Sequence, residues 1–455
     1  MTTLHLHQVP HALALVAALR RQGAALDASD TGTGKTFVAV AVAKALGVVP
    51  LVLCPKSVVP GWNRAAKALG WEVEAVGYEK ARGQCTVTRA VMEDDGSVVK
   101  TRKTESIYGR ENKIGTGSQW LWKHPFEAIF FDEVHRCGGM TSLQAKMLIA
   151  AKRQAKYVLC LSATATDRPE KLRALGYALG LFELPKFKWW LMAHGVRPGV
   201  FGGFKFTDDV DDQRAAMLKL NQAIFPARGA RMRKAEIPGF PKTHIAPLLI
   251  EDATGKAAAL LEDIRDLYMK RERQSADAAA RESVLEMLLR RRQALELLKV
   301  GDLADLAVDY AESSRVAIFC HFKETIAALK DALPHTCGVV PVIDGANRAA
   351  ERERFKVEFQ NNEHPVLVCN AAAGGVGLDL HDPTGAVERT ALISPGWSAT
   401  QLKQVFGRVQ RDGGGYSQQF LVGFAGTLEE EILERAKANI DNIDLLNDAV
   451  FSGSF

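Results

Sequence analysis

Residues able to bind phosphate gather in a glycine-containing segment near the start of the chain. The segment Ala28–Thr36 reads Ala-Ser-Asp-Thr-Gly-Thr-Gly-Lys-Thr, and it follows the apolar run Ala24–Asp27 and precedes the helical run Phe37–Leu46. Gly32 and Gly34 allow backbone angles that turn amide N–H groups inward around phosphate oxygens, and the start of a helix adds partial positive charge. The segment therefore predicts a phosphate-binding loop.

The polar residues of this loop have separate expected tasks. Lys35 would reach the β- and γ-phosphates of ATP, and the Thr36 hydroxyl would ligate Mg²⁺. Thr33, between the two glycines, belongs to the same expected nucleotide-binding set. The later segment Thr254–Ala257 also contains Gly-Lys, but it lacks a hydroxyl after the lysine and a preceding apolar strand, so we do not expect it to bind phosphate.

Two adjacent carboxylates end another apolar strand. The segment Phe130–His135 reads Phe-Phe-Asp-Glu-Val-His. Because neighbouring residues at a strand end point in different directions, Asp132 could hold Mg²⁺ while Glu133 orients and deprotonates the attacking water. An Asp-Glu pair alone carries little information, but its place after a phosphate loop indicates a site of hydrolysis. His135 either couples this site to the rest of the chain or caps the turn.

Composition restricts the class of protein. The chain has 455 residues, 47% hydrophobic and 24% charged, an ordinary balance for two or three globular units. No apolar run approaches the roughly 18 residues that a membrane span requires, and the start of the chain lacks a signal-peptide pattern. Seven cysteines without a CxxC pair predict neither a disulfide framework nor a zinc site. We therefore expect a cytoplasmic protein of a reducing compartment, without a membrane partner. The net charge of +5 permits a polyanionic partner but does not require one.

Short apolar runs alternate with helical stretches along the chain. The runs that are apolar on both faces, as in buried parallel strands, are Ala24–Asp27, Leu51–Cys54, Ala128–Phe131, Tyr157–Leu161, Val316–Cys320, Val339–Ile343, Val366–Cys369, Ala391–Ser394 and Phe420–Val422. Alternation with helices predicts an α/β fold with doubly wound parallel sheets. The runs fall into two sets on either side of a long helical middle, so we expect two such lobes.

The expected domain boundaries follow from this division. The first lobe covers residues 1–235, with a hairpin insertion at 85–119 that contains the turn signal Asp95–Gly96. The second lobe covers residues 236–455, with a helical protrusion at about 252–312 that is rich in Ala, Leu, Glu and Arg.

Three further segments resemble motifs of the superfamily 2 helicases. Leu161–Ala165 (Leu-Ser-Ala-Thr-Ala) is similar to the Ser-Ala-Thr motif, Ala371–Leu380 is similar to motif V, and Gln404–Arg411 is similar to motif VI. Together with the phosphate loop and the Asp-Glu pair, they follow the order of that family. The resemblance implies two tandem RecA-like lobes, ATP and Mg²⁺ as cofactors, and a nucleic-acid partner.

The same resemblance assigns roles to single residues. Arg408 and Arg411 are expected to face the γ-phosphate from the second lobe, where an arginine stabilises charge on the transferred phosphoryl group. Gln8 either reads adenine, whose edge its amide can match by donating and accepting, or is a solvated glutamine. Motif V is expected to contribute Gly377 and Asp379 to the nucleotide site. The residues expected to couple hydrolysis to lobe movement are His135, Ser162, Thr164 and Gln404.

Within the superfamily the chain resembles the Snf2-like DNA translocases, in a compact form like phage-type or annealing-helicase-like members. The similar segments are Leu53–Trp62, Arg231–Lys234, Pro238–Lys242, Ala317–Phe322, Ser394–Trp397 and Gly426–Ile432. The chain departs from the Snf2 pattern at Ser29 and Asp30, where Asp-Glu is common, at Asp379, where Asn is frequent, and at Asp412 and Gly413 after motif VI.

Nucleic-acid contact is expected at the loop after Leu51–Cys54, where Lys56 and Ser57 would meet backbone phosphates, and DNA is the expected polymer. Trp62 is expected to be a core residue, and Trp397 either packs or contacts a strand. Three functions compete: a translocase or remodeller on duplex or branched DNA, a strand-separating DNA or RNA helicase, and a binding protein that uses ATP as a clamp switch. Glu133 and the two arginines favour turnover over the third. The sequence indicates no particular protein partner.

Overall fold

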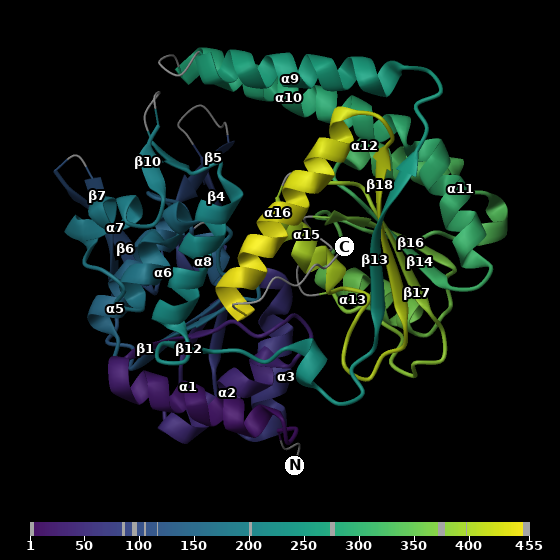
Figure 1. Cartoon of the computed structure of the whole chain (residues 1–455). Helices are drawn as coiled ribbons and strands as arrows, with labels where there is room; N and C mark the ends of the chain where they lie inside the picture. The colour runs from purple at the N-terminus through teal and green to yellow at the C-terminus, as the bar shows by residue number, and fades with distance from the viewer. Residues whose placement is uncertain are drawn as a thin grey trace. The chain divides into compact units, whose positions relative to one another are not determined.

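The chain folds into two compact units, which are described one at a time. The computed structural model describes residues 4–83, 87–92, 98–103, 106–115, 117–199, 203–273, 278–371, 378–396 and 398–448. The first unit comprises Met1–Asp30, Gly34–Val196 and Asp208–Arg233. The second comprises Thr31–Thr33, Arg197–Thr207 and Lys234–Phe455. Figure 1 colours the chain by residue number, so the segments of each unit can be followed.

A six-stranded parallel sheet with the order β12-β1-β9-β8-β2-β3 forms the centre of the first unit. The strands are β1 (Ala24–Asp27), β2 (Leu51–Cys54), β3 (Glu74–Gly77), β8 (Ala128–Asp132), β9 (Tyr157–Leu161) and β12 (Gly229–Ala230). The four strands predicted in this region, β1, β2, β8 and β9, are confirmed. The apolar pattern does not predict the two edge strands, because β3 is partly exposed and β12 has only two residues.

Helices cover both faces of this sheet. One face packs against α1 (Gln8–Gln22), α2 (Lys35–Leu46) and α3 (Val59–Leu69), in a core that includes Leu15 and Trp62. Alternate strand residues such as Phe131 are also fully buried, so the opposite face is covered as well. The later helices of the unit are α4 (Tyr78–Ala81), α5 (Leu143–Gln154), α6 (Arg173–Ala178), α7 (Phe187–Met192) and α8 (Val210–Ile224). Figure 1 shows α5, α6 and α8 on the side away from α1 and α2.

Two antiparallel strand pairs interrupt the first unit between β3 and β8. β4 (Val87–Met92) pairs with β5 (Val98–Lys103), and β6 (Gly109–Ile114) pairs with β7 (Gly117–Trp122). The sequence predicts one hairpin here, and the structure has a second one after it. The expected turn Asp95–Gly96 lies outside the described residues. A further two-stranded sheet consists of β10 (Val196–Pro198) and β11 (Phe204–Phe206).

The second unit contains another six-stranded parallel sheet, with the order β13-β18-β17-β14-β16-β15. Its strands are β13 (Thr243–Ile250), β14 (Arg315–Cys320), β15 (Val342–Ile343), β16 (Val366–Asn370), β17 (Arg389–Ile393) and β18 (Ser417–Phe424). The five predicted strands are confirmed, and β13 is the addition. Pro247 lies within β13, and an edge strand tolerates proline because one side of it makes no ladder bonds. Two parallel sheets covered by helices confirm the expected α/β fold of two RecA-like lobes.

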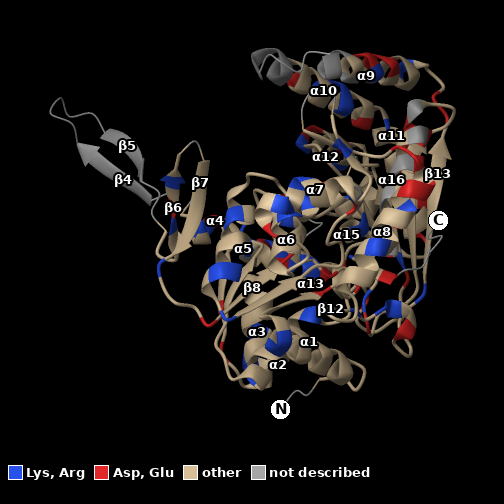
Figure 2. Cartoon of the chain, turned by 60° about the vertical axis from the view of Figure 1, so that its left-hand side comes forward, with Lys and Arg blue, Asp and Glu red and all other residues tan. Residues whose placement is uncertain are grey.

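The helices of the second unit are α9 (Lys256–Arg273), α10 (Ala278–Leu298), α11 (Val300–Ala311), α12 (Lys323–Ala332), α13 (Ala349–Gln360), α15 (Ala399–Phe406) and α16 (Leu428–Asp448). α9 and α10 pack against each other through buried side chains that include Leu261, Ile264 and Leu288. Figure 2 shows residues of both charge signs along α9, where Arg291 of α10 pairs with Asp263. Within the described ranges, no helix is both long and apolar enough to cross a membrane.

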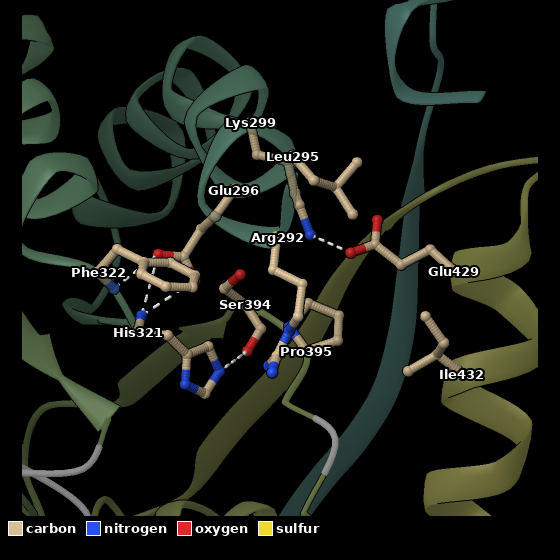
Figure 3. A pocket seen from close by; sticks show the side chains of 10 residues that line it. All are labelled: Arg292, Leu295, Glu296, Lys299, His321, Phe322, Ser394, Pro395, Glu429 and Ile432. Carbon is tan, nitrogen blue, oxygen red and sulfur yellow. Dashed lines mark hydrogen bonds and ion pairs between the residues drawn. The ribbon is translucent and has the colours of Figure 1, made fainter. Parts of the chain in front are cut away.

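A buried carboxylate joins α10 to the loop that follows β14 (Figure 3). Glu296 of α10 is 3% exposed. It accepts hydrogen bonds from the main-chain N–H of His321 at 3.0 Å and of Phe322 at 3.1 Å. The loop is held from two more sides, because the His321 ring bonds to the Ser394 oxygen and Asn370 donates to the His321 oxygen. The loop is therefore fixed by groups from α10, β16 and the end of β17.

A buried ion pair joins Lys299, between α10 and α11, to Glu429 of α16 (Figure 3). The two residues are 1% and 3% exposed. The ammonium donates to one carboxylate oxygen of Glu429, and the other accepts the N–H of Phe424 at 2.9 Å. Removing one member of such a pair destabilises a fold, because it leaves an unpaired charge in a low-dielectric interior.

We predict that Lys299→Met lowers the free energy of unfolding of the second unit by about 3–5 kcal/mol, because Glu429 loses its partner. The double variant Lys299→Met/Glu429→Gln should recover most of that loss, since both groups are then neutral. Scanning calorimetry of the full chain measures both, with Lys256→Met, at an exposed lysine, as the control. Equal losses in the single and double variants would show that the charge pair is not what Lys299 contributes.

Candidate active site

The loop between β1 and α2 has the backbone that phosphate binding requires. α2 begins at Lys35, and its N-cap residue Gly34 has a φ of 85°, while Gly32 has a φ of 88°. Residues that carry a side chain rarely adopt such positive φ values, so glycine is favoured at both positions. At Gly34 an added Cβ would also collide with the side-chain amide of Gln8. The first amides of α2, which have no partner within the helix, thus follow a tight turn, an arrangement that binds anions.

Lys35 lies over this loop among opposite charges. Its ammonium donates to the main-chain oxygens of Ser29 and Asp30, at 2.9 Å in each case. Burial lowers the pKa of Lys35, and the nearby carboxylates, first among them Asp27 and Glu133, oppose that shift. Both oxygen contacts are of the kind that phosphate oxygens also offer to an ammonium group.

A buried hydrogen-bond network supports the loop from beneath. Asp27 and Ser29 are fully buried, and His11 of α1 is 7% exposed. The His11 Nε2 atom lies 3.1 Å from both the Ser29 hydroxyl and the Asp27 carboxylate, and Ser29 N–H donates to Asp27 at 3.0 Å. Burial alone would raise the pKa of Asp27, but His11 and Lys35 outweigh it and the pKa is lowered. An ionised carboxylate therefore anchors the loop.

Arg231 secures the other side of the loop. One terminal nitrogen donates to the main-chain oxygen of Ala28 at 2.6 Å, and the other pairs with Asp30 at 3.0 Å. The next residue, Met232, donates its N–H to the Ser29 hydroxyl at 3.0 Å. The segment that follows β12 therefore supports the phosphate loop directly.

Asp132 lies at the carboxyl end of β8 and is held at each of its oxygens. The Trp62 indole N–H donates to Oδ2 at 2.9 Å, and the N–H of Glu133 donates to Oδ1 at 2.9 Å. The Tyr78 hydroxyl donates to the main-chain oxygen at 2.8 Å. Three separate donors therefore fix both the backbone and the carboxylate of this residue.

Glu133 begins a connected row of polar side chains. Its φ of 54° is left-handed, a backbone conformation that is strained for a residue with a side chain. The His135 Nδ1 atom lies 3.4 Å from the Glu133 carboxylate and 3.1 Å from the Ser162 hydroxyl. Ser162 in turn accepts the N–H of Thr164 at 3.1 Å. Burial lowers the pKa of His135, which favours the neutral ring, and the same atom, Nδ1, faces both Glu133 and Ser162.

Two other expected nucleotide contacts lie beside the loop. Gln8 is the first residue of α1 and is 4% exposed, so it is not a solvated glutamine. Its side-chain oxygen accepts the N–H of His5 at 3.0 Å, and its amide nitrogen lies against Gly34. Thr36 lies half-buried in the first turn of α2.

The oxygen donors of this unit fit Mg²⁺. The Asp132 carboxylate and the Thr36 hydroxyl are hard oxygen ligands of the type that Mg²⁺ takes in nucleotide sites. Burial, and then the adjacent Glu133, raise the pKa of Asp132 to about 7. Lys35 opposes this shift, and a bound divalent cation would likewise favour the charged form of the carboxylate.

In the second unit, Arg411 pairs with Asp379. The Nε atom of Arg411 lies 2.7 Å from a carboxylate oxygen of Asp379. The Nη1 atom of Arg411 has no hydrogen-bond partner within the described residues. The pairing lowers the pKa of Asp379 against the effect of burial, which would raise it. Gly377, the other motif V residue expected at the nucleotide, lies outside the described residues.

Arg408 has different surroundings from Arg411. It is 3% exposed, and its guanidinium donates to the main-chain oxygens of Gln404 at 2.9 Å and Leu378 at 3.1 Å. Gln404 itself is 4% exposed. Arg408 therefore joins α15 to the end of motif V, whereas Arg411 pairs through a carboxylate.

The expected nucleic-acid residues Lys56 and Ser57 are exposed on a short 3₁₀ helix, Lys56–Val58, directly after β2. Trp62 lies in the core as expected, and Trp397 lies outside the described residues.

The motif patterns assign no role in this site to four residues that hold it together: His11, Trp62 as a donor, Tyr78 and Arg231. Each contacts a segment that is distant in sequence. The available signals were weak, namely a histidine three residues after Gln8 and an aspartate ending the otherwise apolar strand β1.

Two family models match the chain. The type III restriction enzyme res subunit matches residues 3–167, which contain the phosphate loop, the carboxylate pair and Ser162. The helicase conserved C-terminal domain matches residues 298–413, which contain Arg408 and Arg411.

Two known proteins are similar over most of the chain. One, from Acanthamoeba polyphaga mimivirus and provisionally named an ATP-dependent RNA helicase, is 25% identical across 98% of this chain and 84% of its own length. The other, a DNA annealing helicase and endonuclease of Mus musculus, is 23% identical across 88% of this chain, which spans 37% of that protein. With the two parallel sheets and the two family matches, these similarities identify the chain as a helicase-like, ATP-dependent enzyme of superfamily 2.

Proposed function

We propose that the chain is a Snf2-like DNA translocase that couples ATP hydrolysis to movement along, or remodelling of, duplex or branched DNA. The observation that carries this proposal is the row from Glu133 through His135 to Ser162 and Thr164. It places the residue that would activate water within two side-chain contacts of the Ser-Ala-Thr segment.

The chain's own residues have distinct tasks in this proposal. The phosphate loop and Lys35 bind the β- and γ-phosphates, and Gln8 reads adenine. Thr36 and Asp132 hold Mg²⁺, which neutralises phosphate charge when bound. Glu133 orients the attacking water and accepts its proton, and the His135 ring, 3.4 Å from the carboxylate, supports its position. Arg411 supplies positive charge to the γ-phosphate from the second lobe, while Gly377 and Asp379 complete that side of the nucleotide site.

Duplex DNA is the proposed track because the Snf2-like segments extend through both units, and because one relative is named a DNA annealing helicase. Lys56 and Ser57, exposed after β2, are the proposed backbone contacts. The competing function is strand separation on DNA or RNA, and the name of the viral relative favours RNA.

We predict that duplex DNA stimulates ATP hydrolysis by the full chain more than single-stranded DNA or RNA does. Parallel rate measurements with the three polymers at one salt concentration test this, since phosphate contacts weaken steeply as salt rises. A strand-displacement assay on tailed duplexes is the companion measurement. Strong stimulation by RNA alone, or efficient unwinding, would replace the proposed function with the competing one.

Glu133→Gln should bind ATP with Mg²⁺ as the parent does but hydrolyse it at least about 100-fold more slowly, because an amide cannot accept the proton of water. Nucleotide binding by calorimetry and single-turnover hydrolysis separate the two effects. Glu72→Gln, at an exposed glutamate of the same unit, is the control. Loss of nucleotide affinity in proportion to the rate would make Glu133 a ligand instead of the base.

Arg411→Ala should lower stimulated hydrolysis by about 10³-fold or more and leave ADP affinity unchanged, because an arginine that meets the γ-phosphate acts in the transition state. Arg408→Ala should also slow hydrolysis, but together with a lower melting temperature, since two buried carbonyls lose their donor. Arg290→Ala, at an exposed arginine paired with Glu286, is the control. Stimulated turnover within a few-fold of the parent in Arg411→Ala would contradict the assignment.

A further inference from the structure

Trp62 has a polar contact that core packing alone does not require. It lies on α3, is 1% exposed and is among the largest fully buried side chains of the described residues. Its indole N–H donates to Oδ2 of Asp132 at 2.9 Å. An indole N–H can only donate a hydrogen bond, and an ionised carboxylate can only accept one. Trp62 is therefore always the donor in this contact and Asp132 the acceptor. A purely apolar side chain of similar volume could fill the same space without it.

The carboxylate of Asp132 depends on this contact for its orientation. The Tyr78 hydroxyl binds the main-chain oxygen of Asp132 and so fixes the backbone, not the carboxylate. The N–H of Glu133 holds Oδ1, and Trp62 holds Oδ2. The last torsion of an aspartate side chain has a broad energy minimum, so its hydrogen bonds set its angle. Without the indole donor, Oδ1 alone would be fixed and the carboxylate plane could turn about it.

We propose that Trp62 is a positioning residue for the metal site, whose indole N–H holds the Asp132 carboxylate in the orientation that receives Mg²⁺. This inference rests on the proposed role of Asp132 in Mg²⁺ binding. Each carboxylate oxygen has two lone pairs, so the indole can donate to one while the other stays open. Hydrogen-bond partners of metal ligands typically contribute about 10–100-fold to metal affinity.

Trp71 provides a matched control in the same unit. Its indole N–H also makes a 2.9 Å hydrogen bond, to the main-chain oxygen of Val48, and its ring packs against the same hydrophobic core. Trp71→Phe therefore removes the same donor, at the same distance, from an oxygen outside the site. The loss of an indole donor from a 2.9 Å hydrogen bond is therefore common to Trp62→Phe and Trp71→Phe.

Calorimetric titration of ADP into the full chain, once with Mg²⁺ and once with EDTA, tests the inference without measuring hydrolysis. The ratio of the two affinities is the gain that Mg²⁺ contributes. Trp62→Phe should reduce this gain by about 10-fold or more and leave the affinity in EDTA unchanged. Trp71→Phe should leave both affinities unchanged. If Trp62→Phe fails to fold, benzothienylalanine at position 62 removes the N–H at nearly the same volume.

The variant Asp132→Ala separates failure of this inference from failure of the metal assignment. Asp132→Ala should lose most of the gain from Mg²⁺. If it keeps the gain, Asp132 does not serve the metal, and the proposed assignment and this inference are both wrong. If Asp132→Ala loses the gain but the Trp62 variant keeps it, the metal assignment stands and Trp62 only packs. A Trp62 variant that weakens ADP equally in Mg²⁺ and EDTA would also make Trp62 a packing residue.

Discussion

Two adjacent, half-buried carboxylates at the carboxyl end of β8 are the constraint on which the first unit depends. A carboxylate that loses part of its hydration is destabilised without partners, so Asp132 and Glu133 require donors and positive charge from other segments. Those segments follow other strands of the same parallel sheet: Lys35 comes after β1, Trp62 after β2 and Tyr78 after β3. Parallel strands bring their carboxyl ends to one edge, which is why such distant residues meet.

The second unit meets the same constraint with groups from its helices. Glu296 and Lys299, at the end of α10, and Glu429 of α16 are buried beside the ends of β14 and β18. Each of these side chains bonds to main-chain groups there. Polar contacts as well as apolar packing therefore hold the helical protrusion to the rest of the second unit. His321, held by Glu296 and by the Ser394 oxygen, marks where these contacts reach the strand ends.

Local patterns predict most of the fold and the centre of the site. Strands such as β1 and β9 are recognisable because both faces are apolar, and the phosphate loop because Gly32, Gly34 and Lys35 are close in sequence. What sequence patterns miss depends on tertiary neighbours. The edge strand β13 is half-buried, so its alternation is weak. The prediction that Trp62 is a core residue is confirmed. Its hydrogen bond to Asp132 could not be predicted, because the two residues meet only once the sheet is folded.

The ion pair with Asp379 is a charge contact that holds the Arg411 side chain within the second unit, and its energy determines how easily the side chain can leave. The Asp379 side chain is 47% exposed and that of Arg411 12%, so solvent screens the pair from the carboxylate side and it contributes on the order of 1 kcal/mol. An arginine that stabilises phosphoryl transfer is worth about 10³–10⁵ in rate, or roughly 4–7 kcal/mol. The energy of the Arg411–Asp379 ion pair is therefore too small to cancel the stabilisation of the transition state. In the proposed mechanism Arg411 can therefore exchange Asp379 for a phosphate, whereas Arg408, buried on two carbonyl oxygens, has no comparable freedom.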